Sequence, residues 1–204
     1  DIQRVMIAMA GSKKTEQWDV VWHDRQGQER LLAFELGRGF RYRVVVRDAQ
    51  DDARFLQVFL RPPQTALLAV DGGLLSNLKV DENVLLPLSY HGGDTHEQES
   101  RVLELFALCG LDEQQTRSIL HRLPHQLTAQ QKRAAGFVRA LLVQTEVMVY
   151  ASVWHDLPQA ERQQILSLDE ILRRVVPTRT SVFVDYDTNM DEGLQPQQTF
   201  YLQE

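Results

Sequence analysis

Short runs of β-branched, aromatic and aliphatic residues recur along the chain between polar segments. Runs of this length, bounded by polar residues, glycine or proline, predict β-strands. We predict strands at residues 18–23, 30–35, 40–46, 65–70, 146–153 and 180–184. The first two flank the turn sequence Gln26-Gly27-Gln28, which predicts a β-hairpin, and the consecutive valines at 44–46 predict a strand buried on both faces.

Between these runs the apolar residues are spaced three and four apart, as in helices with one buried face. We predict helices at residues 51–60, 100–108, 112–121, 128–142 and 159–175, with Thr128 as an N-cap. Strands that alternate with helices predict an α/β fold with a largely parallel sheet. The polar tail from residue 187 ends in the apolar run TFYL, which could add an edge strand.

Composition excludes several classes of protein. The chain has 204 residues, is 43% hydrophobic and carries a net charge of −6, which argues against nucleic acid as a partner. A single cysteine, Cys109, excludes an intrachain disulfide and suits a reducing compartment. No apolar run reaches the roughly 18 residues of a membrane span, and the first ten residues lack the pattern of a secretory leader.

The most specific stretch is residues 71–88, which read DGGLLSNLKVDENVLLPL. It resembles the Q-loop and the start of the helical subdomain in ATP-binding subunits of ABC transporters, in the subgroup of lipid-type and solvent-resistance importers. The resemblance implies one domain, 1–204, with a RecA-like P-loop NTPase core and a helical subdomain at about 74–142. It also implies that this stretch contacts a membrane permease, through Gly72, Gly73, Leu74, Leu75, Asn77, Leu78, Glu82 and Asn83.

The phosphate-binding loop of the family should follow the strand at 40–46, but the chain reads RDAQDDARFL there. The stretch has no glycine, lysine, serine or threonine, and it brings Asp48, Asp51 and Asp52 to the loop, with Arg54 near the usual lysine position. Two like charges about 4 Å apart repel by roughly 4 kcal/mol at an effective dielectric near 20. We therefore interpret the stretch as a solvated loop that starts a helix with acidic residues in its first turn.

The other motifs of the family also differ here. Val70 stands where the Q-loop glutamine is usual, and Tyr186 stands where the family has a histidine. The signature LSGGQ corresponds to Leu127 followed by Thr128, Ala129, Gln130 and Gln131. In the family two acidic residues that hold Mg²⁺ and polarise water follow four apolar residues, here 147–150, and Ala151 and Ser152 stand at those two positions.

These differences favour a catalytically degenerate ABC-type nucleotide-binding subunit that is not an enzyme and takes neither ATP nor magnesium. Its expected partners are a membrane permease and either an active ATPase subunit or a second copy of itself, on the cytoplasmic side of the cell membrane. One alternative is an active ABC ATPase that uses Arg54 and Thr128 in place of the usual groups. A second alternative is a free-standing scaffold or regulatory protein.

Two histidine pairs were weighed as metal ligands. His121 and His125 are four apart, but Pro124 interrupts the helix between them and the glutamate of a zinc-protease motif is absent. His91 and His96 lie in a sequence that is more typical of a surface loop. We expect no metal site at either pair.

Overall fold

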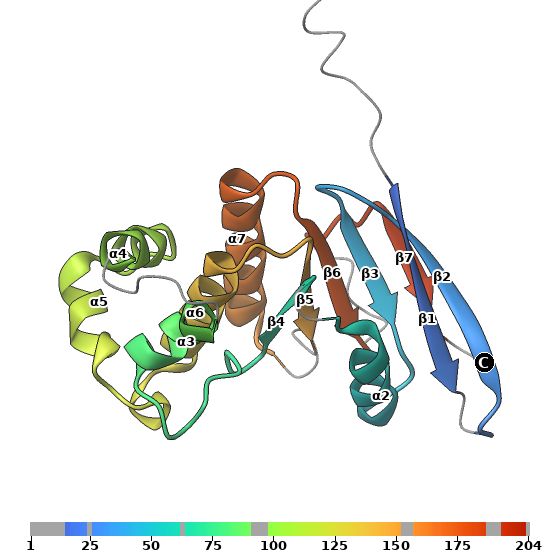
Figure 1. The fold of residues 1–204 in the computed structure, drawn as a ribbon, viewed down its shortest axis with the longest axis horizontal. Coiled ribbons are helices and arrows are strands. Elements are labelled where there is room, and N and C mark those ends of the chain that lie inside the picture. Colours follow the sequence, from blue (N-terminus) through green and yellow to red (C-terminus); the bar gives the residue numbers. More distant parts are fainter. Residues whose placement is uncertain are drawn as a thin grey trace, which may run out of the picture.

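The computed structural model of the chain describes residues 15–23, 26–61, 64–90, 98–151, 157–186 and 193–202. Its centre is a five-stranded sheet with the order β4-β5-β6-β3-β7, in which every neighbouring pair is parallel (Figure 1). The strands are β3 Arg41–Val45, β4 Thr65–Ala69, β5 Val147–Ala151, β6 Thr180–Asp185 and β7 Gln198–Tyr201. The predicted α/β fold with a largely parallel sheet is confirmed, and the apolar run at the tail does form the edge strand β7.

The predicted hairpin forms a separate two-stranded antiparallel sheet from β1 Thr15–His23 and β2 Glu29–Gly37. Alternate residues of both strands point to one buried face, as the period of two in a strand requires. The helix α2 Ala49–Phe59 packs against that face, where Trp18 lies 5.6 Å from Phe59 and Trp22 lies 6.3 Å from Phe55, centroid to centroid. The middle and the end of α2 are therefore held by the hairpin.

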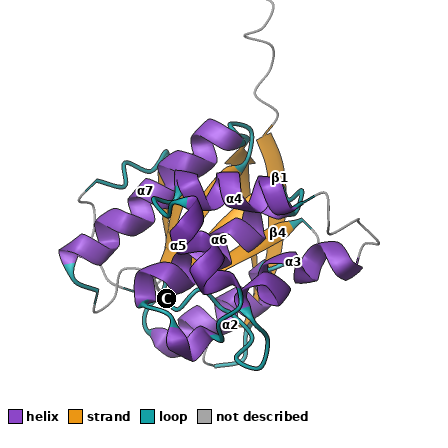
Figure 2. Ribbon diagram, turned by 90° about the vertical axis from the view of Figure 1, so that its left-hand side faces the viewer, coloured by secondary structure: helices purple, strands orange, loops and turns teal. Residues whose placement is uncertain are grey.

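The remaining helices occupy the other side of the sheet from the hairpin (Figures 1 and 2). They are α3 Val80–Tyr90, α4 Glu99–Leu108, α5 Glu113–Leu120, η1 Pro124–Gln126, α6 Ala129–Leu142 and α7 Gln159–Val175. Helices α3 to α6 share a buried cluster of their own that includes Val84, Phe106 and Ile119. The boundary of a helical subdomain at about 74–142 stays a prediction.

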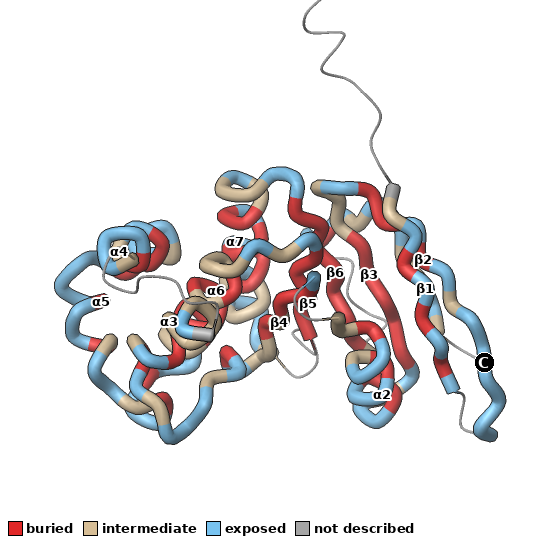
Figure 3. The backbone as a smooth tube through the Cα atoms, in the orientation of Figure 1, coloured by how far each residue is buried: buried red, intermediate tan, exposed pale blue. Residues whose placement is uncertain are grey.

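The inner strands are buried along their length, whereas the hairpin and the outer helices are exposed on one face (Figure 3). Two side chains depart from the sequence-based interpretation. Asp51 and Asp52 are only 4% and 5% exposed, so the first turn of α2 is not a solvated loop as predicted. None of the helices described is both long enough and apolar enough to cross a membrane.

Candidate site at the carboxyl edge of the sheet

The sheet brings most of the motif positions together. Val70 follows β4, Ala151 ends β5, Tyr186 follows β6 and Asp48 comes shortly after β3. Because these strands are parallel, their carboxyl ends meet at one edge, where open α/β sheets bind ligands. The structure thus assembles a candidate site from residues that are up to 138 positions apart, which is 186 minus 48. Ser152 lies outside the described residues.

Asp48 caps the start of α2. Its backbone is extended, and its carboxylate accepts hydrogen bonds from the backbone N–H groups of Gln50 at 3.0 Å and Asp51 at 3.1 Å. Free N–H groups at a helix start are what a phosphate binds in P-loop proteins. Here a carboxylate of the chain itself holds two of them.

The cations near this helix differ from the sequence-based expectation. Arg54 is exposed on the second turn of α2, six residues after the cap, which is about 9 Å along the helix axis at 1.5 Å per residue. It does not lie at the helix start, where the family's lysine would be. Arg47, which the sequence analysis missed, precedes the cap directly, and its Nε lies 4.0 Å from Oδ2 of Asp51.

The strand β5 lacks an acid at its end, but its neighbour has one. Ala151 pairs with Val184 of β6, so Asp185 lies one residue further along the same edge. Asp185 is 3% exposed, and its Oδ1 accepts a hydrogen bond from the backbone N–H of Tyr186 at 2.7 Å. The sequence offered no signal for this residue, because the family motif directs attention to the end of β5.

The signature-like segment forms a capping box at the start of α6. Thr128 Oγ1 accepts from the N–H of Gln131 at 3.2 Å, and Gln131 Oε1 accepts from the N–H of Thr128 at 3.0 Å. The predicted N-cap is confirmed. Ala129 and Gln130 are exposed beside it.

The segment expected to contact a permease, residues 72–83, is called the docking segment below. Asn83 organises it from inside: it is 0% exposed, its Nδ2 donates to the carbonyls of Leu75, Leu78 and Lys79, and its Oδ1 accepts from the N–H of Leu75. Leu75 itself is 48% exposed. Of the residues predicted to touch a partner, Gly72 and Asn83 are buried, Leu74 and Leu78 are half-buried, and Gly73, Leu75, Asn77 and Glu82 are exposed.

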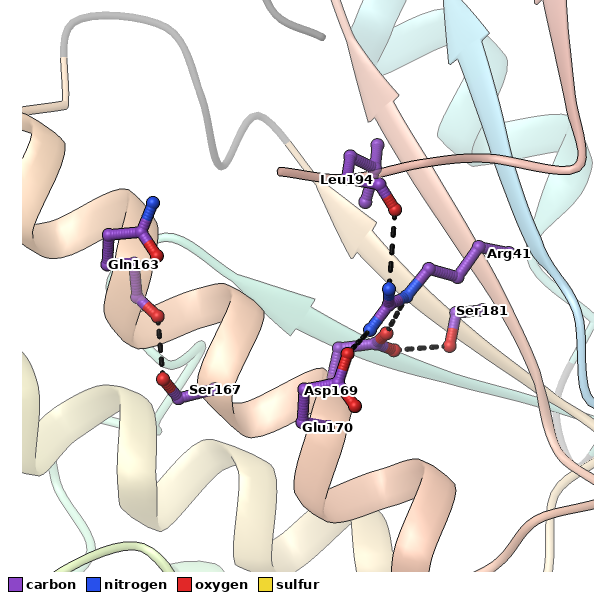
Figure 4. Close-up of polar contacts among 7 residues, drawn as sticks. All are labelled: Arg41, Gln163, Ser167, Asp169, Glu170, Ser181 and Leu194. Atoms are coloured by element: carbon purple, nitrogen blue, oxygen red, sulfur yellow. Dashed lines mark hydrogen bonds and ion pairs between the residues drawn. The ribbon is translucent and has the colours of Figure 1, made fainter. Parts of the chain in front are cut away.

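A buried ionic cluster lies between α7 and the amino ends of β3 and β6 (Figure 4). Asp169 is 0% exposed and accepts hydrogen bonds from Arg41 and Ser181. Arg41 also pairs with Glu170 and donates to the carbonyl oxygen of Leu194 at 3.3 Å. One guanidinium thus joins β3, α7 and the C-terminal segment.

Arg41 and Glu170 shift each other's pKa. The hydrogen bond from Arg41 is the largest cause of the lowered pKa of Glu170. Burial works against the charged form of Arg41, but its two carboxylates outweigh burial and raise its pKa. Both shifts favour the ionised forms of Arg41 and Glu170, and the cluster acts as a structural clamp.

A cavity of about 270 Å³ lies at the amino edge of the sheet, opposite the candidate site. It is lined in part by Glu16, Arg38, Glu146, Arg179 and Thr180. The Arg179 guanidinium donates to the carbonyl of Ala140 in the last turn of α6 and to those of Val143 and Thr145 just after it. The cavity is thus a gap between the hairpin and the sheet and not an extension of the carboxyl edge.

No group of three or more metal-ligating side chains occurs within the described residues. His121 instead lies 3.2 Å from a carboxylate oxygen of Asp81, and His125 is exposed. The second histidine pair, His91 and His96, lies outside the described residues.

No family model matches the chain. Curated relatives do. The trimethylamine N-oxide transport system ATP-binding protein TmoW of Ruegeria pomeroyi is 28% identical over 137 residues, 67% of this chain and 38% of the relative. The methionine import ATP-binding protein MetN of Vibrio cholerae is 35% identical over 50% of this chain and 28% of its own length. The lipoprotein-releasing system ATP-binding protein LolD 1 of Rhodopirellula baltica is 30% identical over 56% of this chain and 46% of its own. The chain thus spans less than half the length of these relatives.

Solved structures share the fold. The cbiO1 protein of Clostridium perfringens, part of the ABC transporter complex cbiONQ, superposes with a TM-score of 0.65 at 14% identity over 84% of this chain and 80% of its own. The ATP-binding cassette MJ0796, in a dimeric post-hydrolysis state bound to ADP and phosphate, gives 0.62 at 17% identity over 86% and 89%. The P-loop NTPase fold of the ATP-binding cassette expected from the resemblance is confirmed.

These comparisons correct two expectations. The chain was expected not to be an enzyme and to take neither ATP nor magnesium, because its motifs differ from the usual ones. Both expectations are wrong, since the relatives are ATP-binding proteins of transport systems and a fold neighbour is an ATP-binding cassette seen after hydrolysis. The sequence relatives, on a fold that the solved neighbours share, support the family of ABC transporter ATP-binding subunits for this chain.

Proposed function

We propose that the chain is the ATP-binding subunit of a membrane transport system, with Mg·ATP bound at the carboxyl edge of the sheet. The observation that carries the proposal is the match to ATP-binding transport proteins over up to 67% of the chain, and it is supported by a sheet whose parallel strands β3 to β6 end at one edge. The subunit would work at the cytoplasmic face of a membrane, docked on a permease, as a dimer or beside a second ATPase subunit. The sequence of residues 71–88 resembles that of lipid-type importers and therefore favours a lipid-type substrate for that permease.

In this proposal the ATP phosphates bind at the start of α2. The phosphate oxygens accept hydrogen bonds from the N–H groups of Gln50 and Asp51 once the carboxylate of Asp48 moves aside. Arg47 supplies a positive charge in the same loop. Mg²⁺ bound to nucleotide usually takes phosphate oxygens, waters and one or two carboxylates. Asp185, at the end of the neighbouring strand β6, is the candidate carboxylate for that role.

Calorimetric titration with Mg·ATP tests the proposal, and Asp48→Asn sharpens it. Asparagine keeps the helix cap but removes the charge. A like charge at about 4 Å costs roughly 4 kcal/mol at an effective dielectric near 20, so even partial relief predicts at least tenfold tighter binding.

Asp112→Asn is the matched control, because Asp112 caps α5 in the same way and lies in the helical region. It should leave the affinity unchanged. Absence of saturable binding to both the unmodified chain and Asp48→Asn at millimolar Mg·ATP would refute the proposal.

Docking on a permease is tested separately through the exposed Leu75. Leu75→Asp places a charge on the outer surface of the docking segment and should abolish co-purification with the permease. Leu31→Asp is the control, because Leu31 is 69% exposed on the hairpin, far from that segment in the fold. Equal loss with both variants, or with neither, would mean that residues 72–83 are not the contact.

A further inference from the structure

Arg133 of α6 is an almost fully buried arginine, 2% exposed, whose guanidinium meets two other parts of the chain. Its Nη1 donates to the carbonyl oxygen of Val70 at 3.3 Å. Its Nε donates to Gln164 Oε1 at 2.9 Å, and its Nη2 pairs with Glu161 Oε2 at 2.7 Å. Arg133 therefore joins α6, the turn after β4 and the first turns of α7.

The turn itself, residues 70–73, lies flat on α6. A Cβ on Gly72 would sit 2.1 Å from the carbonyl oxygen of Lys132, and one on Gly136 would sit 2.2 Å from that of Gly72. Arg139 adds a hydrogen bond from Nη2 to the Gly72 carbonyl at 3.2 Å. Two arginines of one helix thus hold two carbonyls of this turn, those of Val70 and Gly72, on the way to the docking segment.

Val70 stands at the position where the Q-loop glutamine is usual. Valine has no polar side-chain atom, so at this position only the backbone can form a hydrogen bond, and Arg133 takes the carbonyl. A buried guanidinium loses several kcal/mol of hydration, so it stays where its carboxylate partner and hydrogen-bond acceptors remain. The contact therefore adds a buried hydrogen bond to a turn that the close packing of Gly72 on Gly136 and the bond from Arg139 also hold.

We propose that Arg133 is a positioning residue that locks turn 70–73, and with it the docking segment, to α7 whether or not nucleotide is bound. The proposal rests on the proposed function, because it concerns how the permease-facing surface relates to the nucleotide site. In this chain the docking surface is held by an arginine of the protein and is not moved by the ligand.

Amide hydrogen exchange without nucleotide tests the lock. The N–H of Gly72 bonds to the carbonyl of Ala69 at 2.9 Å, and that of Leu75 bonds to Asn83, so both report on the turn. Arg133→Met removes the polar contacts at similar length and should speed exchange at residues 72–78 by at least tenfold, with β5 and β6 unchanged.

The control is Arg117→Met, which removes an exposed arginine with two carboxylate partners at the far end of the helical region and should leave the turn unaffected. If Arg133→Met does not fold, Glu161→Gln gives a milder perturbation, because that side chain is 37% exposed, and about threefold faster local exchange is expected. Unchanged exchange at residues 72–78, or an equal increase throughout the sheet, would overturn the lock.

Addition of Mg·ATP to the unmodified chain gives the second arm. Exchange at residues 72–78 should stay within twofold while calorimetry reports binding. A tenfold slowing there would show that nucleotide, and not Arg133 alone, sets the turn. If no ATP binds, the proposed function fails, but the comparison of nucleotide-free variants still decides the role of Arg133.

Discussion

Removal of Asp169 should be among the most damaging single changes in this protein. The carboxylate is fully buried, accepts from Arg41 and Ser181, and joins segments that are 128 residues apart. Breaking a buried ion pair by removing one partner typically costs about 3 to 5 kcal/mol, because the other charge stays buried. For a chain of this size each kcal/mol lowers the Tm by roughly 2 to 4 °C, so Asp169→Ala should lower it by about 6 to 20 °C.

Differential scanning calorimetry measures the effect. Ser167→Ala is the control on the same helix, since its hydroxyl donates to the carbonyl of Gln163 in the previous turn (Figure 4), and it should change stability by less than about 0.5 kcal/mol. The double variant Arg41→Met with Asp169→Leu removes both charges and should lose less than Asp169→Ala alone. A Tm within 2 °C of the unmodified chain for Asp169→Ala would refute the reasoning.

Three further predictions concern backbone, pH and reactivity. Gly72→Ala should lower the free energy of unfolding, measured by chemical denaturation, by about 2 to 5 kcal/mol, because φ is +80° there and the new methyl group meets an α6 carbonyl. Gly110→Ala is the comparison, with φ +85° but open space around the new methyl group, and should lower it by only about 1 to 2 kcal/mol. The hydrogen bond from Arg41 lowers the pKa of Glu170. The ion pair therefore contributes roughly 0.2 to 1 kcal/mol to the free energy of unfolding above pH ~4.3, and this contribution is lost as the pH falls through the lowered pKa. Glu170→Gln should flatten the dependence of unfolding on pH in that range, and an unchanged curve would contradict this. Burial raises the pKa of the Cys109 thiol to about 12, so mass spectrometry should find its alkylation at pH 7.5 at least a hundredfold slower than in the unfolded chain, and equal rates would show that the thiol is accessible.

Most elements of the fold were predictable because each carries its own periodic signal, although α3 was not placed as a separate helix. The helix at 159–175 begins and ends where the sequence predicts, and β5 Val147–Ala151 falls within the strand predicted at 146–153. The apolar runs are continuous, and their alternation with helices leaves few arrangements for a sheet.

The chemistry of the edges was harder to predict. The partnership of Arg41 with Asp169 has no local pattern, because it depends on how α7 packs against the sheet. The burial of Asp51 and Asp52 likewise depends on what packs around the first turn of α2. Comparison of the motifs one position at a time predicted a chain that does not bind ATP. Such a comparison does not reveal that Asp185 of the adjacent strand lies at the same edge of the sheet as Ala151, because that depends on how the strands pair.

The packing of the hairpin on α2 has an optical consequence. Two of the three tryptophans, Trp18 and Trp22, are buried between the hairpin and the helix whose first turn forms the candidate phosphate site. Tryptophan emission shifts to longer wavelength when an indole becomes hydrated. With Trp154 replaced by phenylalanine, the intrinsic fluorescence of this chain becomes a label-free signal of whether that helix stays seated when a ligand arrives.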